Sequence, residues 1–184
     1  MIKSFNEDII KSIQDFKLPK YEEIPNVGLY LEQTAKYISE YLAPLQDGAI
    51  TGSMISNYVK KGLVSNPVKK QYNREQIAYF IFIAIAKNVL SMEDIGLLFE
   101  IQKKTYDAHK AYSYFERELR NVIEYVFGIK DNLDQISENN SGEKLMLRNT
   151  IITVAHKIYL DKYFAKLHKS AEEQDSKKKL MGIS

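Results

Sequence analysis

The feature that most constrains the fold is an uninterrupted apolar run in the middle of the chain. Ten residues, "IAYFIFIAIA", occupy Ile77–Ala86. A membrane-spanning helix needs about 20 apolar residues, so this run is too short to cross a bilayer. Directly before it, "NREQ" has the form of a capping box, with Asn73 as N-cap and Gln76 reaching back. The sequence therefore predicts a buried helix over residues 74–88, around which the rest of the chain must pack.

The remaining sequence also favours helices. Only four prolines and eight glycines interrupt the 184 residues, and apolar residues recur mostly at helical spacing. We therefore expect an all-α protein. The link around 17–25 is expected to be extended, the segment 63–72 to form a turn or a two-stranded ribbon, and the tail after 168 to be frayed. Further helices are predicted near 2–16, 27–42, 51–61, 92–104, 108–127 and 143–168.

One predicted helix carries a seam for a partner helix. Its apolar residues follow a 4-3-4-3-4 spacing, which is typical of helix–helix packing, either within the chain or across a homodimer. We divide the chain into a head with N-terminal helices at 1–104 and a helical dimerisation or accessory region at 105–184. The seam residues are Ala108, Tyr112, Phe115, Leu119, Val122 and Val126.

The amino-acid composition narrows the classes of protein to which the chain can belong. The chain has no cysteine, which excludes disulfides and thiolate metal sites and fits a cytoplasmic location. Charges are scattered through the N-terminal residues, which is not typical of a signal peptide, and we expect no membrane association. The net charge is only +2, so any surface for nucleic acid must come from local clustering of basic residues.

The segment 50–80 contains such a cluster. On a helical wheel of the predicted 51–61 helix, Met54, Ile55 and Tyr58 share one side, which we expect to pack inward. The opposite side holds hydroxyls, a carboxamide and an ammonium, groups that suit the base edges of a DNA major groove. We predict base contacts from Ser53, Ser56, Asn57 and Lys60.

Basic residues beyond this face predict contacts to phosphate. They extend from the end of the helix through the following link to the start of the central helix, where no acid precedes Glu75. Phosphate contacts position a protein on duplex DNA without reading its sequence. The predicted phosphate contacts are the basic residues Lys61, Lys69, Lys70 and Arg74 and, at the start of the helix, the Thr51 hydroxyl.

The stretches "ITGSMISNYVKKGLV", "YNREQIAYFIFI" and "LSMEDIGLLFEI" resemble the DNA-binding head of MerR-type transcriptional regulators. Tyr58 matches the tyrosine of the family's recognition helix, and Gly62-Leu63 matches the turn that follows. The chain departs from the family at Ser56 and Asn57, in its short wing and in its long preceding helix. The resemblance implies a winged helix-turn-helix followed by a long-helix C-terminal region, in a DNA-binding transcriptional regulator.

A longer segment, about 18–127, is similar to a bacterial family catalogued as a domain of unknown function. The motifs "LPxxEEIP", "MIxNYVKxGL" and "KKxYxREQIAY" carry this second resemblance. Members of that family are presumed to bind DNA through a MerR-like head, which implies double-stranded DNA as the partner.

The sequence bears on two classes of protein other than a DNA-binding regulator. An enzyme is not expected, because no HExxH motif, phosphate-binding loop or paired nucleophile and base is found. No metal or other cofactor is expected either. A helical protein-interaction or small-molecule sensor module is the alternative, since tyrosines and phenylalanines crowd the region 106–127. Its effector pocket or dimer interface would involve Tyr112, Phe115 and Tyr125.

Overall fold

The structure is a computed structural model that describes residues 2–45, 48–135 and 141–180. Within these ranges the chain is mostly helical, with a single small two-stranded sheet, which confirms the expected mainly-α class. In chain order the elements are α1 (Ile2–Lys11), the 3₁₀ helix η1 (Tyr21–Glu23), β1 (Leu29–Tyr30), α2 (Leu31–Leu42), α3 (Gly52–Lys60), β2 (Gln71–Tyr72), α4 (Arg74–Ala86), α5 (Met92–Thr105), α6 (Ala108–Val126) and α7 (Gly142–Leu180).

Helix α4 lies at the centre of the core, as predicted. Its capping box is present: the Asn73 side chain accepts a hydrogen bond from the Gln76 backbone at 2.9 Å, and the Gln76 side chain accepts one from the Asn73 backbone at 2.8 Å. Phe80, Ile81 and Ile83 are completely buried, and α4 contacts α2, α6 and α7. A helix that is apolar on nearly all sides requires such surroundings.

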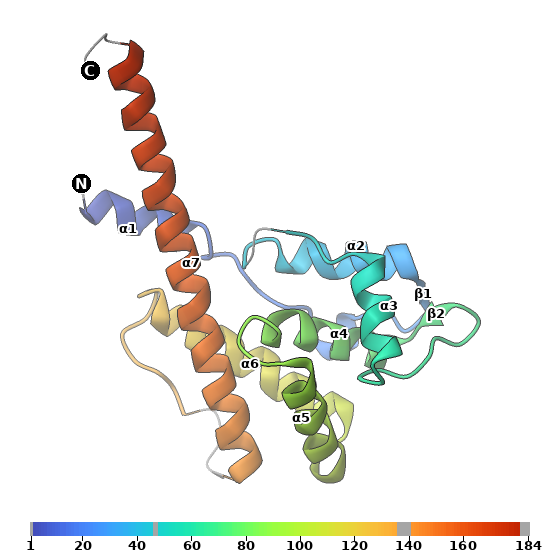
Figure 1. The fold of residues 1–184 in the computed structure, drawn as a ribbon. Coiled ribbons are helices and arrows are strands. Elements are labelled where there is room, and N and C mark those ends of the chain that lie inside the picture. Colours follow the sequence, from blue (N-terminus) through green and yellow to red (C-terminus); the bar gives the residue numbers. More distant parts are fainter. Residues whose placement is uncertain (1, 46–47, 136–140, 181–184) are drawn as a thin grey trace.

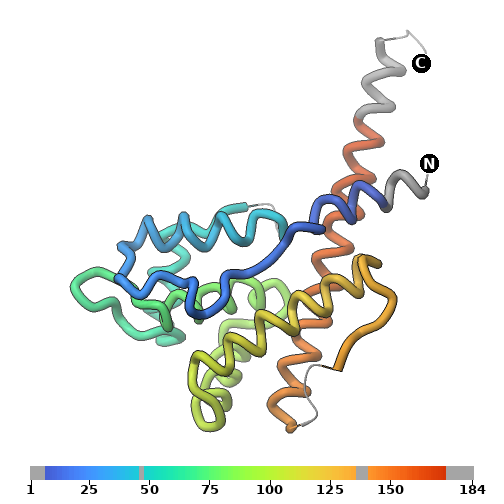
Figure 2. Tube along the Cα trace, turned by 180° about the vertical axis from the view of Figure 1, so that it is seen from behind, coloured from blue at the N-terminus to red at the C-terminus, as the bar shows by residue number. Residues whose placement is uncertain are grey.

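The elements gather at two ends of the molecule (Figures 1 and 2). One end carries α2, α3 and the short strands, whereas the other carries α6 and α7, with α4 between them. The C-terminal half of α7 extends beyond the body, next to the N-terminal α1, and the Lys166 ammonium pairs with the Asp8 carboxylate there.

The predicted helix seam finds its partner within the chain. Helix α6 makes its most extensive helix contact with α7, whose buried side contributes Ile151, Val154 and Ala155. Of the seam residues, Leu119 and Val122 are completely buried. At the start of the seam, the Phe115 ring lies 5.0 Å from the ring of Phe82 on α4. Packing of α4, α6 and α7 therefore accounts for the seam without a second copy of the chain.

The helix predicted at 27–42 begins later than expected, which corrects that prediction. Leu29 and Tyr30 instead form β1, which pairs antiparallel with β2, so that Leu29 faces Tyr72 and Tyr30 faces Gln71. Gly28 permits this pairing, because a Cβ atom at that position would lie 2.6 Å from the Cβ of Gln71. Of the two alternatives predicted for 63–72, the segment forms a turn closed by Val68 and Gln71, and its strand β2 pairs with the distant Leu29–Tyr30.

The terminal helices also differ from their predicted bounds. Helix α1 ends at Lys11, where Ser12 Oγ donates a hydrogen bond to the Ile9 carbonyl at 2.7 Å and competes with continued helix. Helix α7 continues to Leu180, so the expectation of a frayed tail from 169 is wrong as far as that residue. Residues 169–180 contain no glycine or proline and are mostly good helix formers, which favours this continuation.

One hydrophobic core contains residues from both sides of the division predicted at 104/105, for example Ile81 of α4 and Leu119 of α6. The division itself stays a prediction. In the part of the chain that the structure describes, every helix is too short or too polar to span a bilayer.

Candidate nucleic-acid interface

Helix α3 has defined ends. The Thr51 side chain accepts a hydrogen bond from the Met54 backbone at 3.3 Å, which makes Thr51 the N-cap. After Lys60, Gly62 adopts a φ of +74° and ends the helix in the left-handed region that favours glycine. Both features agree with the helix predicted over 51–61.

The two sides of α3 differ in burial as the helical wheel predicts. Ile55 and Tyr58 are buried and Met54 is half-buried, and the Tyr58 ring centroid lies 6.4 Å from that of Phe80 on α4. The opposite side is open to solvent. Its exposed residues are those predicted to contact bases, Ser53, Ser56, Asn57 and Lys60.

Helix α3 packs directly against α2. Residues 43–51 connect the two helices, which is longer than the turn of three or four residues in a short helix-turn-helix. Ser39 of α2 anchors this connection, because its Oγ accepts a hydrogen bond from the Ile50 backbone at 2.9 Å. Gly52 allows close contact, since a Cβ atom there would lie 3.1 Å from Leu31 Cγ. Packing, more than the connection, therefore sets the position of α3.

A tight turn follows α3 and presents two lysines. Val68 and Gln71 exchange backbone hydrogen bonds of 3.0 and 2.9 Å, which leaves only Lys69 and Lys70 in the loop. Both lysines have positive φ, 50° and 65°, the arrangement of a type I′ turn. Such turns favour asparagine and glycine, so the two lysines hold a strained backbone. Strain of this kind clusters at functional sites.

The cap of α4 fixes this turn relative to the body. The Gln76 side-chain amide donates to the carbonyls of Ser65 and Asn66 at 2.9 and 3.1 Å. Tyr72 is buried, and its ring meets Phe80 edge-on at 5.2 Å. The same residue that caps the central helix therefore also anchors the segment leading to the two lysines.

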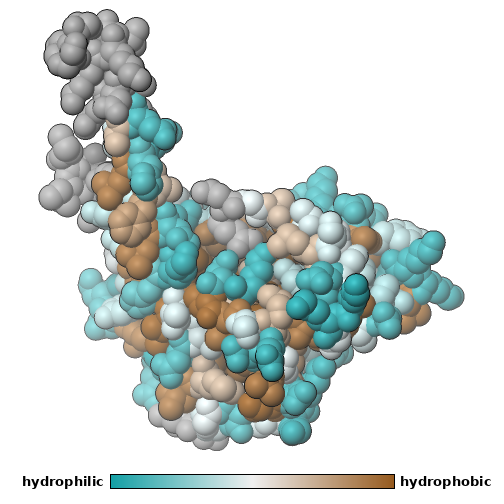
Figure 3. All heavy atoms as spheres, viewed as in Figure 1, coloured by the Kyte–Doolittle hydropathy of each residue, from teal (hydrophilic) through white to brown (hydrophobic). Residues whose placement is uncertain are grey.

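The exposed charge of this region is mainly positive. Lys60, Lys61, Lys69 and Lys70 are all exposed, and within the described ranges none of them forms an ion pair. We call the exposed side of α3, Lys61 and the Val68–Gln71 turn together the basic face. Figure 3, drawn in the view of Figure 1, shows mainly hydrophilic surface at the end of the molecule where these elements lie.

Arg74 lies outside the basic face and is already engaged within the chain, while its contact to phosphate stays a prediction. Its guanidinium donates hydrogen bonds to the carbonyls of Ile24 and Glu22 at 2.8 and 2.9 Å and lies 5.7 Å from the Tyr21 ring centroid. These contacts commit Arg74 to holding the N-terminal link against α4. A phosphate would have to compete with them.

The three residues predicted for an effector pocket or dimer interface do not all lie at one site. Tyr112 and Phe115 are buried and line a cavity between α4, α5, α6 and α7. The Tyr112 hydroxyl donates to the Pro19 carbonyl at 3.0 Å, and burial raises the pKa of this phenol well above its usual range. Tyr125 is exposed and does not line this cavity, so its predicted alternative place in a dimer interface stays a prediction.

Two residues at the basic face, Glu32 and Val68, could not be identified from the sequence. Glu32 of α2 lies beside the N-terminus of α3, where a Cβ atom on Gly52 would clash with its Oε1. The helix pattern of α2 shows only that Glu32 is solvent-facing, not that it meets α3. Val68 is 72% exposed beside the two lysines, and it closes their turn through a bridge with Gln71.

The family model for the Domain of unknown function (DUF1836) matches residues 19–115, more than half of the chain. The chain belongs to the DUF1836 family. The DUF1836 match includes the basic face and the whole of α4 and α5, but it stops at Phe115 within α6 and excludes α7. No curated protein and no solved structure matches the chain. Among the described residues, no group of three or more histidines, aspartates or glutamates is arranged to hold a metal ion.

Proposed function

We propose that this DUF1836 protein is a DNA-binding transcriptional regulator with a MerR-like helix-turn-helix, in which α3 is the recognition helix. The observation that carries the proposal is the basic face. It combines an exposed polar side of α3 with four exposed lysines that have no ion-pair partner among the described residues.

The exposed side of α3 has the chemistry that base recognition requires. The Asn57 carboxamide can form two hydrogen bonds with adenine, and the Lys60 ammonium can meet guanine or phosphate. Ser53 and Ser56 carry short hydroxyls that donate or accept, so they adapt to any base edge. The four side chains are exposed together, because they lie opposite the side of α3 that packs on the core.

The turn supplies contacts to the DNA backbone. A type I′ turn projects its two central residues away from the strands, and here both carry ammonium groups. Lys61 at the end of α3 and the Thr51 hydroxyl at its start add groups that can reach phosphate. The Glu32 carboxylate lies near the N-terminus of α3 and would repel a DNA phosphate. We therefore expect replacement of Glu32 by a neutral residue to strengthen DNA binding.

A homodimer would bring two copies of the basic face onto one DNA duplex. The observation that supports a dimer is a stripe of exposed apolar residues on the protruding half of α7 (Figure 3). Leu160, Phe164 and Leu167 are 48%, 53% and 42% exposed and follow a 4-3 spacing. Such a stripe favours pairing with a second helix, and the α6 seam is already occupied within the chain.

The test is a binding titration with fragmented genomic DNA at low salt. We expect the double variant Lys69→Gln with Lys70→Gln to lose at least tenfold in affinity. The control is Lys103→Gln with Lys104→Gln, an adjacent exposed pair on α5 that loses the same charge away from the basic face. Absence of binding by the unaltered chain, or equal losses in both double variants, would reject the proposal.

A second candidate function is a small-molecule sensor module without DNA binding. The cavity lined by Tyr112 and Phe115 is the observation that favours it. The same titration separates the two functions, because a sensor alone would not bind DNA.

A further inference from the structure

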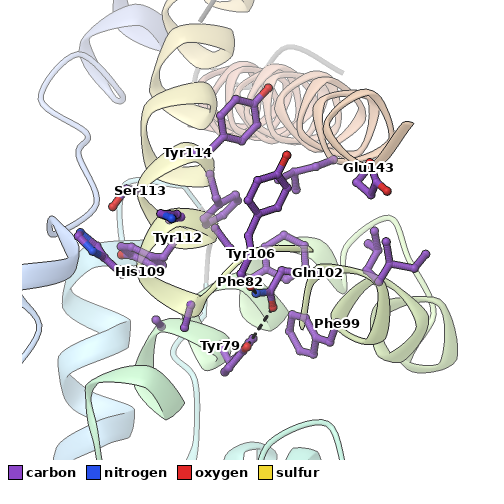
Figure 4. A pocket seen from close by; sticks show the side chains of 18 of the residues that line it. Tyr79, Phe82, Phe99, Gln102, Tyr106, His109, Tyr112, Ser113, Tyr114 and Glu143 are labelled. Atoms are coloured by element: carbon purple, nitrogen blue, oxygen red, sulfur yellow. Dashed lines mark hydrogen bonds between the residues drawn. The ribbon is translucent and has the colours of Figure 1, made fainter. Parts of the chain in front are cut away.

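A cavity of about 350 Å³ lies where the head helices meet the C-terminal helices (Figure 4). Helices α4, α5 and α6 form its walls, and the first residues of α7 close one side. Its volume lies at the lower end of the range typical of small-molecule sites. Most of its surface is apolar, and the residues that carry the argument below are Tyr79, Phe82, Phe99, Gln102, Tyr106 and Ala111.

Aromatic rings make up much of the wall. Phe99 of α5 meets Tyr79 edge-on, with ring centroids 4.7 Å apart, and lies 5.5 Å from Phe82. Phe82 in turn lies 5.0 Å from Phe115 of α6. Aromatic pairs contribute stabilisation beyond the burial of their area when rings stack or meet edge-on. A flat ring entering this space would therefore gain contacts that a puckered ring of the same size would not.

One edge of the cavity is polar and ordered. The Tyr79 hydroxyl donates to Gln102 Oε1 at 2.9 Å, and Gln102 Nε2 donates to the Tyr106 carbonyl at 2.6 Å. Burial raises the pKa of Tyr79 to about 12, so this phenol stays protonated. Each of the two side chains retains further capacity, since a hydroxyl oxygen can accept and a carboxamide has a second N–H. A ligand with one hydroxyl or ring nitrogen would find a partner there.

The rim adds a cation above two further rings. Lys144, at the start of α7, places its ammonium 5.9 Å from the ring centroids of both Tyr106 and Tyr114. Cation–π contacts of this length hold the start of α7 against α6. Most of the cavity lining comes from helices, and Tyr106 in the link between α5 and α6 completes it.

We propose that this cavity is a binding site for a planar aromatic compound of two fused rings that carries a hydroxyl or ring nitrogen. The flat rings would stack among Tyr79, Phe82 and Phe99. The polar atom would bond to the Tyr79 hydroxyl or the Gln102 carboxamide. The binding site does not depend on DNA binding, and its test uses the full chain without DNA.

The experiment is isothermal calorimetry with 2-naphthol and with decahydro-2-naphthol, which has the same connectivity and hydroxyl but puckered saturated rings. We expect 2-naphthol to bind about tenfold more tightly, which corresponds to roughly 1.4 kcal/mol from the aromatic contacts. Equal affinities for the two compounds, or no heat with 2-naphthol at millimolar concentration, would overturn the proposal.

Two variants localise the binding. Ala111→Leu fills the cavity from α6 and should abolish binding, whereas Tyr79→Phe keeps the ring and should weaken 2-naphthol roughly fivefold by removing one hydrogen-bonding group. Tyr30→Phe removes a hydroxyl from an exposed tyrosine outside the cavity and should change nothing. Thermal unfolding of each variant shows whether it is folded. Unchanged affinity in folded Tyr79→Phe and Ala111→Leu would place the ligand elsewhere and reject the site.

Discussion

At the residue scale, Tyr58 joins α3 to the core and leaves one group unsatisfied. Its hydroxyl is buried and has no hydrogen-bond partner among the described residues, and burial raises the pKa of the phenol. A buried hydroxyl without a partner costs about 1–3 kcal/mol. The ring packs near Phe80, and the hydroxyl adds nothing to that contact.

We therefore expect Tyr58→Phe to raise the free energy of unfolding by about 1 kcal/mol. Urea denaturation measures this, with Tyr30→Phe as an exposed control that should change stability by less than about 0.5 kcal/mol. A loss of stability in Tyr58→Phe would show that the hydroxyl has a partner after all.

A buried ion pair connects α6 to α7. The Glu118 side chain is completely buried, and Arg148 Nε lies 3.0 Å from its Oε1, although without the alignment of a hydrogen bond. Removing Arg148 would leave a buried carboxylate without its counter-charge, a change that typically costs 3–5 kcal/mol. We expect Arg148→Ala to lose about that much stability in urea unfolding at pH 8. Combining it with Glu118→Gln should recover part of the loss, and no recovery would contradict the charge argument.

The same pair gives a pH dependence with a definite sign. Desolvation raises the pKa of Glu118 above its ordinary value of 4.5, while Arg148 lowers it in part. The folded state therefore binds the Glu118 proton more tightly than the unfolded state. Protonated Glu118 contributes to the free energy of unfolding at low pH, and this contribution is lost as pH rises through the folded pKa. Without Arg148 that pKa rises further. The deficit of Arg148→Ala should accordingly be smaller at pH 5 than at pH 8, and an equal deficit at both would contradict it.

At the element scale, the Val68–Gln71 turn places two positive charges side by side, and its strained backbone lowers the stability of the chain. Its two lysines adopt positive φ, where residues other than glycine store about 1–3 kcal/mol each. We expect Lys69→Asn with Lys70→Gly, the preferred residues of a type I′ turn, to stabilise the chain by about 1 kcal/mol. Thermal unfolding checks the gain. A destabilised double variant would show that the turn is not of this type.

The helices themselves could be predicted from local signals. The Asn73–Gln76 capping box, the apolar run of α4 and the two sides of α3 are all properties of neighbouring residues. Strand β1 could not be predicted, because Leu29 acquires its partner Tyr72 only when the chain folds back. A turn within 63–72 was expected, but its type was not, since Lys69 and Lys70 lack the asparagine and glycine that mark type I′ turns.

The role of Arg74 illustrates the same limit. Its position beside a basic cluster suggested a phosphate contact, but the carbonyls of Glu22 and Ile24 that it binds are about fifty residues away in sequence. Charge patterns show which cations exist, and only the fold shows which of them are already engaged.

At the scale of the whole molecule, the cavity is the least local feature. Its walls come from four helices, so aromatic spacing along α6 indicated Tyr112 and Phe115 but also Tyr125, which lies outside. In the sequence, residues of α4 and α5 such as Phe82 and Phe99 show only the spacing typical of core packing and do not indicate a cavity. Their convergence depends on the fold, which brings Phe99 of α5 against Tyr79 and Phe82 of α4.

The proposed dimer is also a property of the whole molecule. We expect the chain to sediment as a dimer at micromolar concentration and Leu160→Lys to shift it to a monomer. Leu145→Lys is the matched control, because Leu145 lies on the same helix, is 55% exposed and stands outside the apolar stripe. A monomeric mass for the unaltered chain would refute the dimer, and so would dissociation by both variants equally.

The central claim is that the basic face binds DNA, and the salt dependence of the binding affinity tests this claim most directly. Each phosphate neutralised contributes about −0.9 to the log–log slope of affinity against salt, so four lysines should give about −3.6 per protomer. Replacing Lys60, Lys61, Lys69 and Lys70 by glutamine should bring that slope close to zero. No binding at low salt, or a slope unchanged by the four replacements, would contradict the account.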